Sequence, residues 1–599
     1  MDKRKTLKQW LDEHPIGSCF LLLVLLFVFW RGALHSGFVT LDTGWLVVEN
    51  QLLASGDLAV FQDIFWAVDA DRRWETLGAE FLPIRDISVW LDFQLFGDKW
   101  IYHHAMSLAL YLIGCVLVYL LATDLLNDSV RGFLVAALFG LLPVHLPNVV
   151  WLASRKDLLG LCFSLLSMLA ALKGPVRRGM LISALFFLLA IWSKNTSYCV
   201  VVWLFGTIWL LRPSRWKGRW ALAFVLYGGI GLICVLLSFA MGQQVGIIAS
   251  KYHENIIELI FLQGRLLLKY CVLLFDSSSL CLFHPVPEFR PLLQWQNVLG
   301  LLVYGGMFGA IWICRKKAPF VSLGCLFFLG GLIPVSQIIS LQNVMADRYL
   351  LMPSLGAVLI IASLPKKLLF DGMILGVSLV VGMGMMQRLP IWYDDVSLLQ
   401  DVVGKHPGSQ KHEELFLWAQ LEQGAPIEVA RQAVQKYPHF GGLHHLLAKE
   451  LVAENNWVEA EQHYRQAVVL QPNERRYVHD LGYVLYKTGK LDDAFDTMIS
   501  LTNLHPDYAM AWNSLAAMYI DKYQIDNNQR NILQGIVAVE NATSLEPTNS
   551  MAWCNGGTLH YLAANYDKAM VHWERCVHLN PESTVGQQGL LHLQRILSR

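Results

Sequence analysis

The 599-residue chain carries 47 Lys and Arg against 47 Asp and Glu, and 55% of its residues are hydrophobic whereas only 16% are charged. This composition, with a mean hydropathy of +0.41, excludes a single soluble globular domain, and the zero net charge gives no general attraction to nucleic acid. The apolar excess lies in residues 1 to about 390, where the runs suit membrane-spanning helices of about 20 residues each, whereas residues 400–599 resemble soluble helices.

The apolar run at 16–30 is predicted to stay as the first transmembrane helix, because it lacks a small-residue signal-cleavage site. Four basic residues precede it, so the positive-inside rule places the N-terminus in the cytoplasm and a long loop at about 35–101 outside. Further crossings are predicted at about 104–122, 132–150, 157–172, 179–192, 198–211, 219–241, 295–314, 319–340, 348–364 and 369–387. The basic clusters at 315–317 and 366–367 fall on the cytoplasmic side only if residues 258–285 do not cross the membrane completely. We therefore expect this segment to be interfacial or re-entrant. The C-terminal region then lies outside the cytoplasm.

Prolines punctuate the C-terminal region at 438, 472, 506, 547 and 581, with spacings of 34, 34, 41 and 34 residues. This is the period of tetratricopeptide (TPR) helix pairs with one seven-residue insertion. We predict regular units at 440–473, 474–507 and 549–582, an enlarged unit at 508–548, a degenerate unit at about 408–439 and a cap at 583–599. Such a groove is either a generic interaction module or a receptor for a protein substrate, and both interpretations stay open.

The eleven cysteines include no CxxC pair, and nine lie in or beside apolar segments, where buried small side chains are the favoured interpretation. Cys554 and Cys576 fall within one TPR unit. A disulfide between them is possible, although small buried residues are common at such TPR positions. The sequence shows no metal-ligand spacing, so no metal site is predicted.

Polar side chains gather at the predicted outer ends of the membrane spans, where charge is costly unless it lines a cavity. Each side chain alone could be an interfacial anchor or a helix cap. Together, a carboxylate among cations suits transfer of a group away from a phosphate, with the carboxylate accepting the proton of an attacking hydroxyl. The five clusters are Asp42, Glu49 and Asn50; Arg85, Asp86, Asp92, His103 and His104; His145, Asn148, Arg155, Lys156 and Asp157; Ser193, Lys194 and Asn195; and Asp347, Arg348 and Tyr349.

Residues 142–157, LPVHLPNVVWLASRKD, resemble the HPVHxEAVAWVSGRKD segment of the transmembrane and TPR-containing O-mannosyltransferase family. The resemblance continues in order through 38–42, 49–50, 91–92, 96–97, 102–103, 193–194, 346–354 and 392–395. It implies the GT-C glycosyltransferase fold and transfer of a sugar from a polyprenyl-phosphate carrier to protein Ser or Thr hydroxyls on the extracytoplasmic face. The sequence departs from the family at several positions. Acidic residues of the family are replaced by Thr43, Pro147 and Asn195, the first His of its motif is replaced by Leu142, and its Arg-Pro-Leu is replaced by residues 85–87. These departures leave open the identity of the sugar and the presence of a divalent metal.

We therefore expect an all-α protein: a polytopic GT-C-type transmembrane helix bundle over residues 1–395, followed by an extracytoplasmic TPR α-solenoid over 396–599. Asp42 is the predicted catalytic base. The predicted ligands of the donor phosphate are Arg85, His145, Arg155, Lys156, Lys194 and Arg348, and the secondary candidates are Glu49, Asp92, His103, Asp157, Asp347 and Tyr349.

The predicted partners are membrane lipid, the polyprenyl-phosphate-linked sugar as donor and a protein acceptor in the TPR groove, with no nucleic acid. No other cofactor is assigned, and a divalent metal stays open. The modest length and few repeats favour a bacterial inner membrane over the endoplasmic reticulum. The alternative function is a non-catalytic TPR membrane scaffold for an envelope assembly or a polysaccharide complex.

Overall fold

The computed structural model describes residues 11–37, 50–54, 58–66, 77, 80–215, 219–244, 252–341, 343–365 and 368–597. Every regular element within these ranges is helical. The chain divides into two compact units, Met1–Lys405 and His406–Arg599, which we call unit 1 and unit 2. The protein is therefore all-α in the part of the chain that the structure describes.

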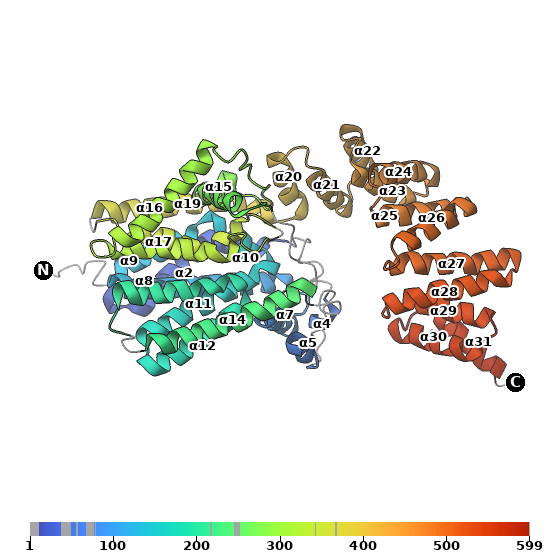
Figure 1. Ribbon diagram of the computed structural model, residues 1–599, viewed down its shortest axis with the longest axis horizontal. Helices are drawn as coiled ribbons and strands as arrows, with labels where there is room; N and C mark the ends of the chain where they lie inside the picture. The colour runs from blue at the N-terminus through green and yellow to red at the C-terminus, as the bar shows by residue number, and fades with distance from the viewer. Residues whose placement is uncertain are drawn as a thin grey trace. The chain divides into compact units, whose positions relative to one another are not determined.

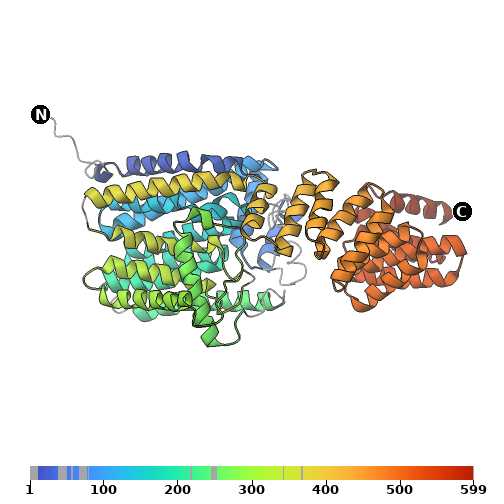
Figure 2. The same ribbon diagram turned by 90° about the horizontal axis from the view of Figure 1, so that it is seen from above.

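Unit 1 contains long apolar helices (Figure 1). Six of its described helices are long and apolar enough to cross a membrane. They are α2 (Pro15–Trp30), α8 (Trp100–Leu126), α12 (Val176–Ser193), α14 (Trp220–Gln244), α16 (Trp295–Ile313) and α19 (Leu368–Arg388). In Figure 2, α2 and α19 run alongside each other, and a Cβ atom at Gly382 would lie only 2.9 Å from the Phe29 ring. A side chain at this position would force the Phe29 ring to move.

The other predicted crossings are bent, short or partly charged. Helix α9 (Ser129–Leu141) bends by 55° into η3 (Pro143–His145) and α10 (Leu146–Val150), because the two prolines of this segment interrupt the helical hydrogen bonds. Three apolar segments are shorter than a full span: η5 (Asn195–Tyr198) with α13 (Cys199–Leu211), α17 (Pro319–Leu332) with η7 (Ile333–Val335), and α18 (Pro353–Ala362). Helix α11 (Arg155–Lys173) begins with three charged residues. The described part thus holds fewer full-length spans than the eleven predicted crossings.

The segment predicted to be interfacial or re-entrant contains helix α15 (Ile256–Leu273). In Figure 2 this green helix runs across the direction of α2 and α19. Its Leu262 and Leu267 are buried, whereas Ile256 and Ile260 are exposed. A crosswise helix with one apolar exposed side has the geometry of a segment lying along a membrane surface.

Short helices gather at one end of unit 1 in Figure 1. They are α4 (Gln51–Ala54), α5 (Val60–Trp66) and α7 (Pro83–Phe96) from the predicted first loop, with α10 from the bent pair. The 3-10 turns η4 (Leu152–Ser154) and η8 (Asp347–Leu350) contact α10. Four of the five predicted polar clusters have their described residues on these elements or at the ends of α8, α11 and α12 beside them.

Helix α20 (Asp395–Lys405) belongs to unit 1, whereas the sequence placed the boundary at residue 395. Asp401 on α20 accepts hydrogen bonds from Arg388 Nη1 at 2.7 Å and from Lys405 Nζ at 2.9 Å. Both cations also donate to the carbonyl of Leu280. These bonds fasten α20 to the end of α19, which explains why the unit ends after it.

Unit 2 is a series of antiparallel helix pairs. Its helices are α21 (Gln410–Glu422), α22 (Ile427–Lys436), α23 (Gly441–Ala453), α24 (Trp457–Leu470), α25 (Arg475–Lys487), α26 (Leu491–Leu504), α27 (Ala509–Asp526), α28 (Gln529–Leu545), α29 (Ser550–Leu562), α30 (Tyr566–Leu579) and α31 (Thr584–Leu597). Ala460, Ala494 and Ala569 each lie 12 residues before one of the repeat prolines, and all three are fully buried. The insertion lengthens α27 to 18 residues and α28 to 17, against 13 or 14 in the regular units. The TPR architecture predicted from the proline spacing is confirmed.

A disulfide joins Cys554 on α29 to Cys576 on α30, with their Cα atoms 5.2 Å apart. The favoured sequence interpretation, two reduced buried side chains, is therefore wrong for this pair. The nine other cysteines, all in unit 1, are free. Disulfides persist in oxidising compartments. The extracytoplasmic position of unit 2 stays a prediction.

We expect alkylation of the denatured chain without reductant to modify nine cysteines, and alkylation after reduction to modify all eleven. Intact-mass spectrometry counts the added groups. The double variant with Cys554→Ser and Cys576→Ser is the control and should give nine under both conditions. Eleven modified cysteines without reductant would contradict the pairing.

Protease added to intact spheroplasts should release a fragment of about 20 kDa containing unit 2, because the positive-inside rule places this unit outside the cytoplasm. The fragment is detected by immunoblotting with a C-terminal tag, and a cytoplasmic marker must stay intact as the control. Release of the fragment only after lysis would overturn the predicted orientation.

Candidate functional site

Arg155, the first residue of α11, lies in a buried ion pair with Asp92 of α7. Its Nη2 donates to the backbone oxygen of His103 at 2.8 Å, and its Nε donates to Ser107 Oγ at 3.2 Å. His103 Nδ1 also lies 3.4 Å from Asp92. The guanidinium is 2% exposed. These predicted site residues come together, but their contacts join α7, α8 and α11 to one another.

His145 is buried in a separate network. Tyr111 Oη lies 2.8 Å from its Nδ1, and Ser354 Oγ lies 2.9 Å from its Nε2. The Phe139 ring packs against the imidazole with ring centroids 4.7 Å apart. Both nitrogens are occupied by protein groups, so the structure places this predicted phosphate ligand at a junction of α8, η3 and α18.

Arg85 and Asp347 also make contacts within the protein. Arg85 donates from Nε to Asp86 at 2.7 Å and from Nη2 to the Leu77 carbonyl at 2.5 Å. Asp347 accepts a hydrogen bond from the Cys281 backbone N–H at 2.9 Å, and its other oxygen lies 2.5 Å from His284 Nε2. Asp347 thereby fastens the loop after α15 to η8.

Three distant segments meet at a second ion cluster. Glu80, in the loop before α7, forms ion pairs with Lys156 of α11 and with Lys194 at the end of α12. The distance from Lys194 Nζ to Glu80 Oε1 is 3.3 Å. The side chains of Lys156, Lys194 and Glu80 are 16%, 12% and 33% exposed, so the cluster is accessible only in part. We call these three residues the Glu80 cluster.

Electrostatics set the protonation of the Glu80 cluster. Burial raises the pKa of the Glu80 carboxyl, but Lys156 and Lys194 together hold that pKa well below its usual range. Burial lowers the pKa of Lys156 to about 8, helped by Lys194 and Arg85 and opposed by Glu80. Burial also lowers the pKa of Lys194, but Glu80 and Asp157 reverse this, so the pKa is raised. Glu80 is therefore charged at neutral pH, and Lys156 is the cation closest to losing its proton.

Arg348 of η8 adds a third cation. Its guanidinium lies over the Trp151 ring at 5.1 Å and the Tyr349 ring at 5.4 Å. No carboxylate within the described ranges lies at ion-pair distance from it. It acts electrostatically on Asp157 and Lys194. A half-buried arginine without a carboxylate partner among the described residues is suited to hold an anion.

Unsatisfied buried polar atoms surround these cations. Asp157 Oδ2, Asn148 Oδ1, Trp151 Nε1 and Asn195 Oδ1 are buried without a hydrogen-bond partner among the described protein atoms. Asn148 Nδ2 lies 3.5 Å from the Arg348 carbonyl oxygen. Because most buried polar groups in folded proteins are bonded, a local group of exceptions indicates a place where water or a ligand binds.

Several predictions fall outside the described residues or gain a structural explanation. The predicted base Asp42 and its neighbour Glu49 lie outside the described residues. Asn50 caps α4 by accepting a hydrogen bond from Leu53 N at 3.0 Å. Tyr349 Oη lies 3.4 Å from the Asn343 carbonyl. In the described ranges, no three His, Cys, Asp or Glu side chains form a group that could hold a metal ion.

Sequence reasoning missed Glu80, Trp151 and His284. Glu80 is one of many acids in the first loop, and nothing in the local sequence distinguishes it. Trp151 lies within the 142–157 motif and could have been identified there as an aromatic surface for a cation. His284 lies near the end of the segment predicted to be interfacial or re-entrant, and the sequence there gives no indication of its partner in η8.

No protein-family profile matches the chain, and no curated protein matches it. Among solved structures, it is similar to YrrB, a TPR protein with an unusual peptide-binding site, at 14% identity over 33% of this chain and 99% of that chain, with a TM-score of 0.26. It is similar to MamA from Desulfovibrio magneticus RS-1 at 16% identity over 32% of this chain and 98% of that chain, with a TM-score of 0.25. It is similar to the P58(IPK) TPR domain at 12% identity over 70% of this chain and 94% of that chain, with a TM-score of 0.20.

Proposed function

We propose that this protein is an integral membrane glycosyltransferase that moves a sugar from a polyprenyl-phosphate carrier to a Ser or Thr hydroxyl of a protein. One observation carries the proposal: Lys156 and Lys194 meet at Glu80 from distant segments, and both act with Arg348 on Asp157, whose Oδ2 is buried and unsatisfied. The three cations belong to the motifs that resemble O-mannosyltransferases.

The cations would hold the donor phosphate and stabilise the charge that develops on it. The acceptor oxygen forms a bond to the anomeric carbon while the bond from that carbon to the phosphate oxygen breaks, and its electron pair stays on the phosphate. A carboxylate takes the proton of the attacking hydroxyl. Glu80 serves as the resident counter-ion, and the arriving phosphate replaces it beside Lys156 and Lys194.

Asp42 is assigned as the base through the resemblance, and Asp157 is the described carboxylate that best fits the role otherwise. Asp157 has one buried oxygen without a hydrogen-bond partner among the described residues, and it acts electrostatically on Lys194. Asp92 is less suited, because Arg155 and His103 already surround its Oδ2. Unit 2 would present the protein acceptor, since TPR grooves bind extended or helical peptides.

Affinity for the phosphate should fall as pH rises above about 8. Lys156 precedes the predicted crossing at 157–172, and its pKa of about 8 lies below its ordinary value of 10.5. Binding an anion favours the protonated lysine, so affinity should be steady near pH 7 and fall by up to about tenfold per pH unit between 8 and 9.5. Binding of polyprenyl phosphate to the full chain in nanodiscs measures this.

The variant Lys156→Arg is the matched control, because arginine stays protonated throughout this range. Its affinity can be lower overall, but its profile should be flat between pH 7 and 9.5. A flat profile for the native chain, or an unchanged slope in Lys156→Arg, would show that Lys156 does not contact the phosphate.

Purification of the full chain with its native lipid, followed by mass spectrometry of the lipid extract, tests the proposed function directly. We expect a polyprenyl-phosphate sugar that is lost from the double variant Lys194→Gln, Arg348→Gln. Its mass would identify the class of sugar.

The second candidate function is a non-catalytic TPR membrane scaffold. The observation favouring it is that Arg155 and His145, two predicted phosphate ligands, are fully engaged by protein groups. The scaffold predicts ordinary membrane lipid in the extract, no polyprenyl-phosphate sugar and no change in the double variant.

A further inference from the structure

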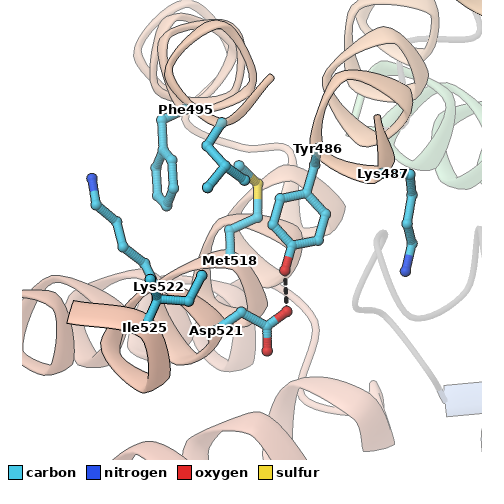
Figure 3. A pocket seen from close by; sticks show the side chains of 8 residues that line it. Tyr486, Lys487, Phe495, Met518, Asp521, Lys522 and Ile525 are labelled. Carbon is cyan, nitrogen blue, oxygen red and sulfur yellow. Dashed lines mark hydrogen bonds between the residues drawn. The ribbon is translucent and has the colours of Figure 1, made fainter. Parts of the chain in front are cut away.

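A hollow of about 190 Å³ lies between α25, α26 and α27 in unit 2. Figure 3 shows Phe495 of α26 pointing toward α27, which carries Met518, Lys522 and Ile525. Small-molecule pockets measure about 300–1,000 Å³. This hollow is smaller, so its size suits one side chain of a protein partner.

The insertion in the 508–548 unit builds one wall of the hollow. The first helix of a regular unit has 13 residues, as α25 does, and a helix of this length beginning at Ala509 would end near residue 521. Helix α27 instead continues to Asp526. Lys522 and Ile525 both lie in this extension, and Ile525 is 74% exposed. Phe495 and Met518 are 6% and 3% exposed. The extension therefore carries an exposed apolar side chain past the buried base of the hollow.

Two lysines border the hollow. Several other cations of unit 2 pair with carboxylates of another helix, as Arg431 does with Glu459 and Lys490 with Glu461. Lys522 instead lies over the Phe495 ring at 4.5 Å, and Lys487 lies over the Tyr483 ring at 5.5 Å. Neither lysine has an ion-pair partner among the residues that the structure describes.

The acid in the lining is already engaged. Asp521 accepts a hydrogen bond from the Tyr486 hydroxyl, and Figure 3 shows the two side chains meeting below Met518. Two cations thus border an apolar hollow while its carboxylate has a partner. The complementary ligand is a bulky apolar side chain with an acidic neighbour.

We propose that this hollow binds a peptide segment of another protein, which inserts one bulky apolar side chain between Phe495 and Ile525 and places an Asp or Glu beside Lys522. The site lies in the enlarged repeat and does not depend on the chemistry proposed for unit 1. Its partner can therefore be recognised without being glycosylated.

Selection from a random peptide library displayed on phage, with the full chain in nanodiscs as bait, tests the proposal. We expect enriched peptides to combine Phe, Leu or Met with a neighbouring Asp or Glu. Binding of the enriched peptides, measured by fluorescence anisotropy, should weaken about tenfold or more in Ile525→Ser and in Lys522→Glu. Ile525 is exposed and Lys522 is a surface cation, so both variants should fold.

Leu533→Ser is the matched control, because Leu533 is 65% exposed on α28 and does not line the hollow. It should bind like the native chain. Three results would each overturn the proposal: no enrichment above empty nanodiscs, enrichment of basic or purely polar peptides, or equal loss in Leu533→Ser and Ile525→Ser. Self-association of the full chain that Ile525→Ser abolishes would also overturn it, because the occupant would then be a second copy.

Discussion

Lys194→Gln is expected to reduce sugar transfer by about 10²–10³-fold, the loss typical of removing one group that stabilises transition-state charge. Lys194 leaves the end of α12 and reaches Glu80 at 3.3 Å, while Asp157 and Glu80 both favour its charged form. Glutamine keeps much of the length but removes the charge. The variant should also retain less polyprenyl phosphate, as counted by native mass spectrometry.

The matched control is Lys173→Gln, at the opposite end of the adjacent helix α11, where the lysine is exposed. It removes the same charge from unit 1 and should leave transfer and lipid retention unchanged. Lys194→Arg should recover part of the activity, because it restores a cation. The proposal is wrong if Lys194→Gln has the same unfolding temperature as the native chain, retains the lipid and transfers sugar normally. The Glu80 cluster would then not be the phosphate site.

The fold could be predicted from the sequence where it depends on spacing along the chain. Proline spacing identifies the helix pairs of unit 2, and the 41-residue interval identifies the enlarged pair, because each repeat is a local unit. The buried alanines follow from the same register. Apolar runs locate the helices of unit 1, but they do not reveal that α9 and α10 bend, because the outcome at the prolines depends on neighbouring helices.

The candidate site could be predicted only in part, because adjacent motif residues separate in space. Arg155 and Lys156 are neighbours in the motif, yet one joins α7 and α8 and the other meets Glu80. Successive side chains on a helix point about 100° apart, so one of the two can pack inward while the other reaches a different partner. Neither those partners nor the choice of Glu80 among the loop acids is encoded in any short pattern.

The disulfide, too, could not be predicted from the sequence pattern alone. Sequence spacing places Cys554 and Cys576 in one repeat, but only the packing of α29 against α30 brings their Cα atoms to 5.2 Å. That separation lies within the usual range of about 4.4–6.8 Å for bonded cysteines. The pair therefore depends on a distance that the repeat pattern alone does not give.

Asp42→Asn is expected to abolish sugar transfer while leaving lipid binding intact. A Ser or Thr hydroxyl is a weak nucleophile at neutral pH, and a carboxylate that takes its proton typically contributes about 10²–10⁴-fold in rate. The assignment comes from the resemblance of residues 38–42 to the first-loop acid of O-mannosyltransferases. Asparagine keeps the shape and the capping ability of aspartate but cannot accept the proton.

Comparison with Asp157→Asn decides between the two candidate bases. Asp157 lies beside the cations, so its amide variant should change the affinity for phosphate as well as the rate, whereas Asp42→Asn should change the rate alone. If Asp42 only caps a helix, Asp42→Asn keeps near-native transfer, since asparagine caps as well as aspartate does. Near-native transfer in Asp42→Asn, together with a loss of rate of about 10²-fold or more in Asp157→Asn, would identify Asp157 as the base that takes the proton. The phosphate site would then also contain the base, and the reaction would need no group from the first loop except Glu80.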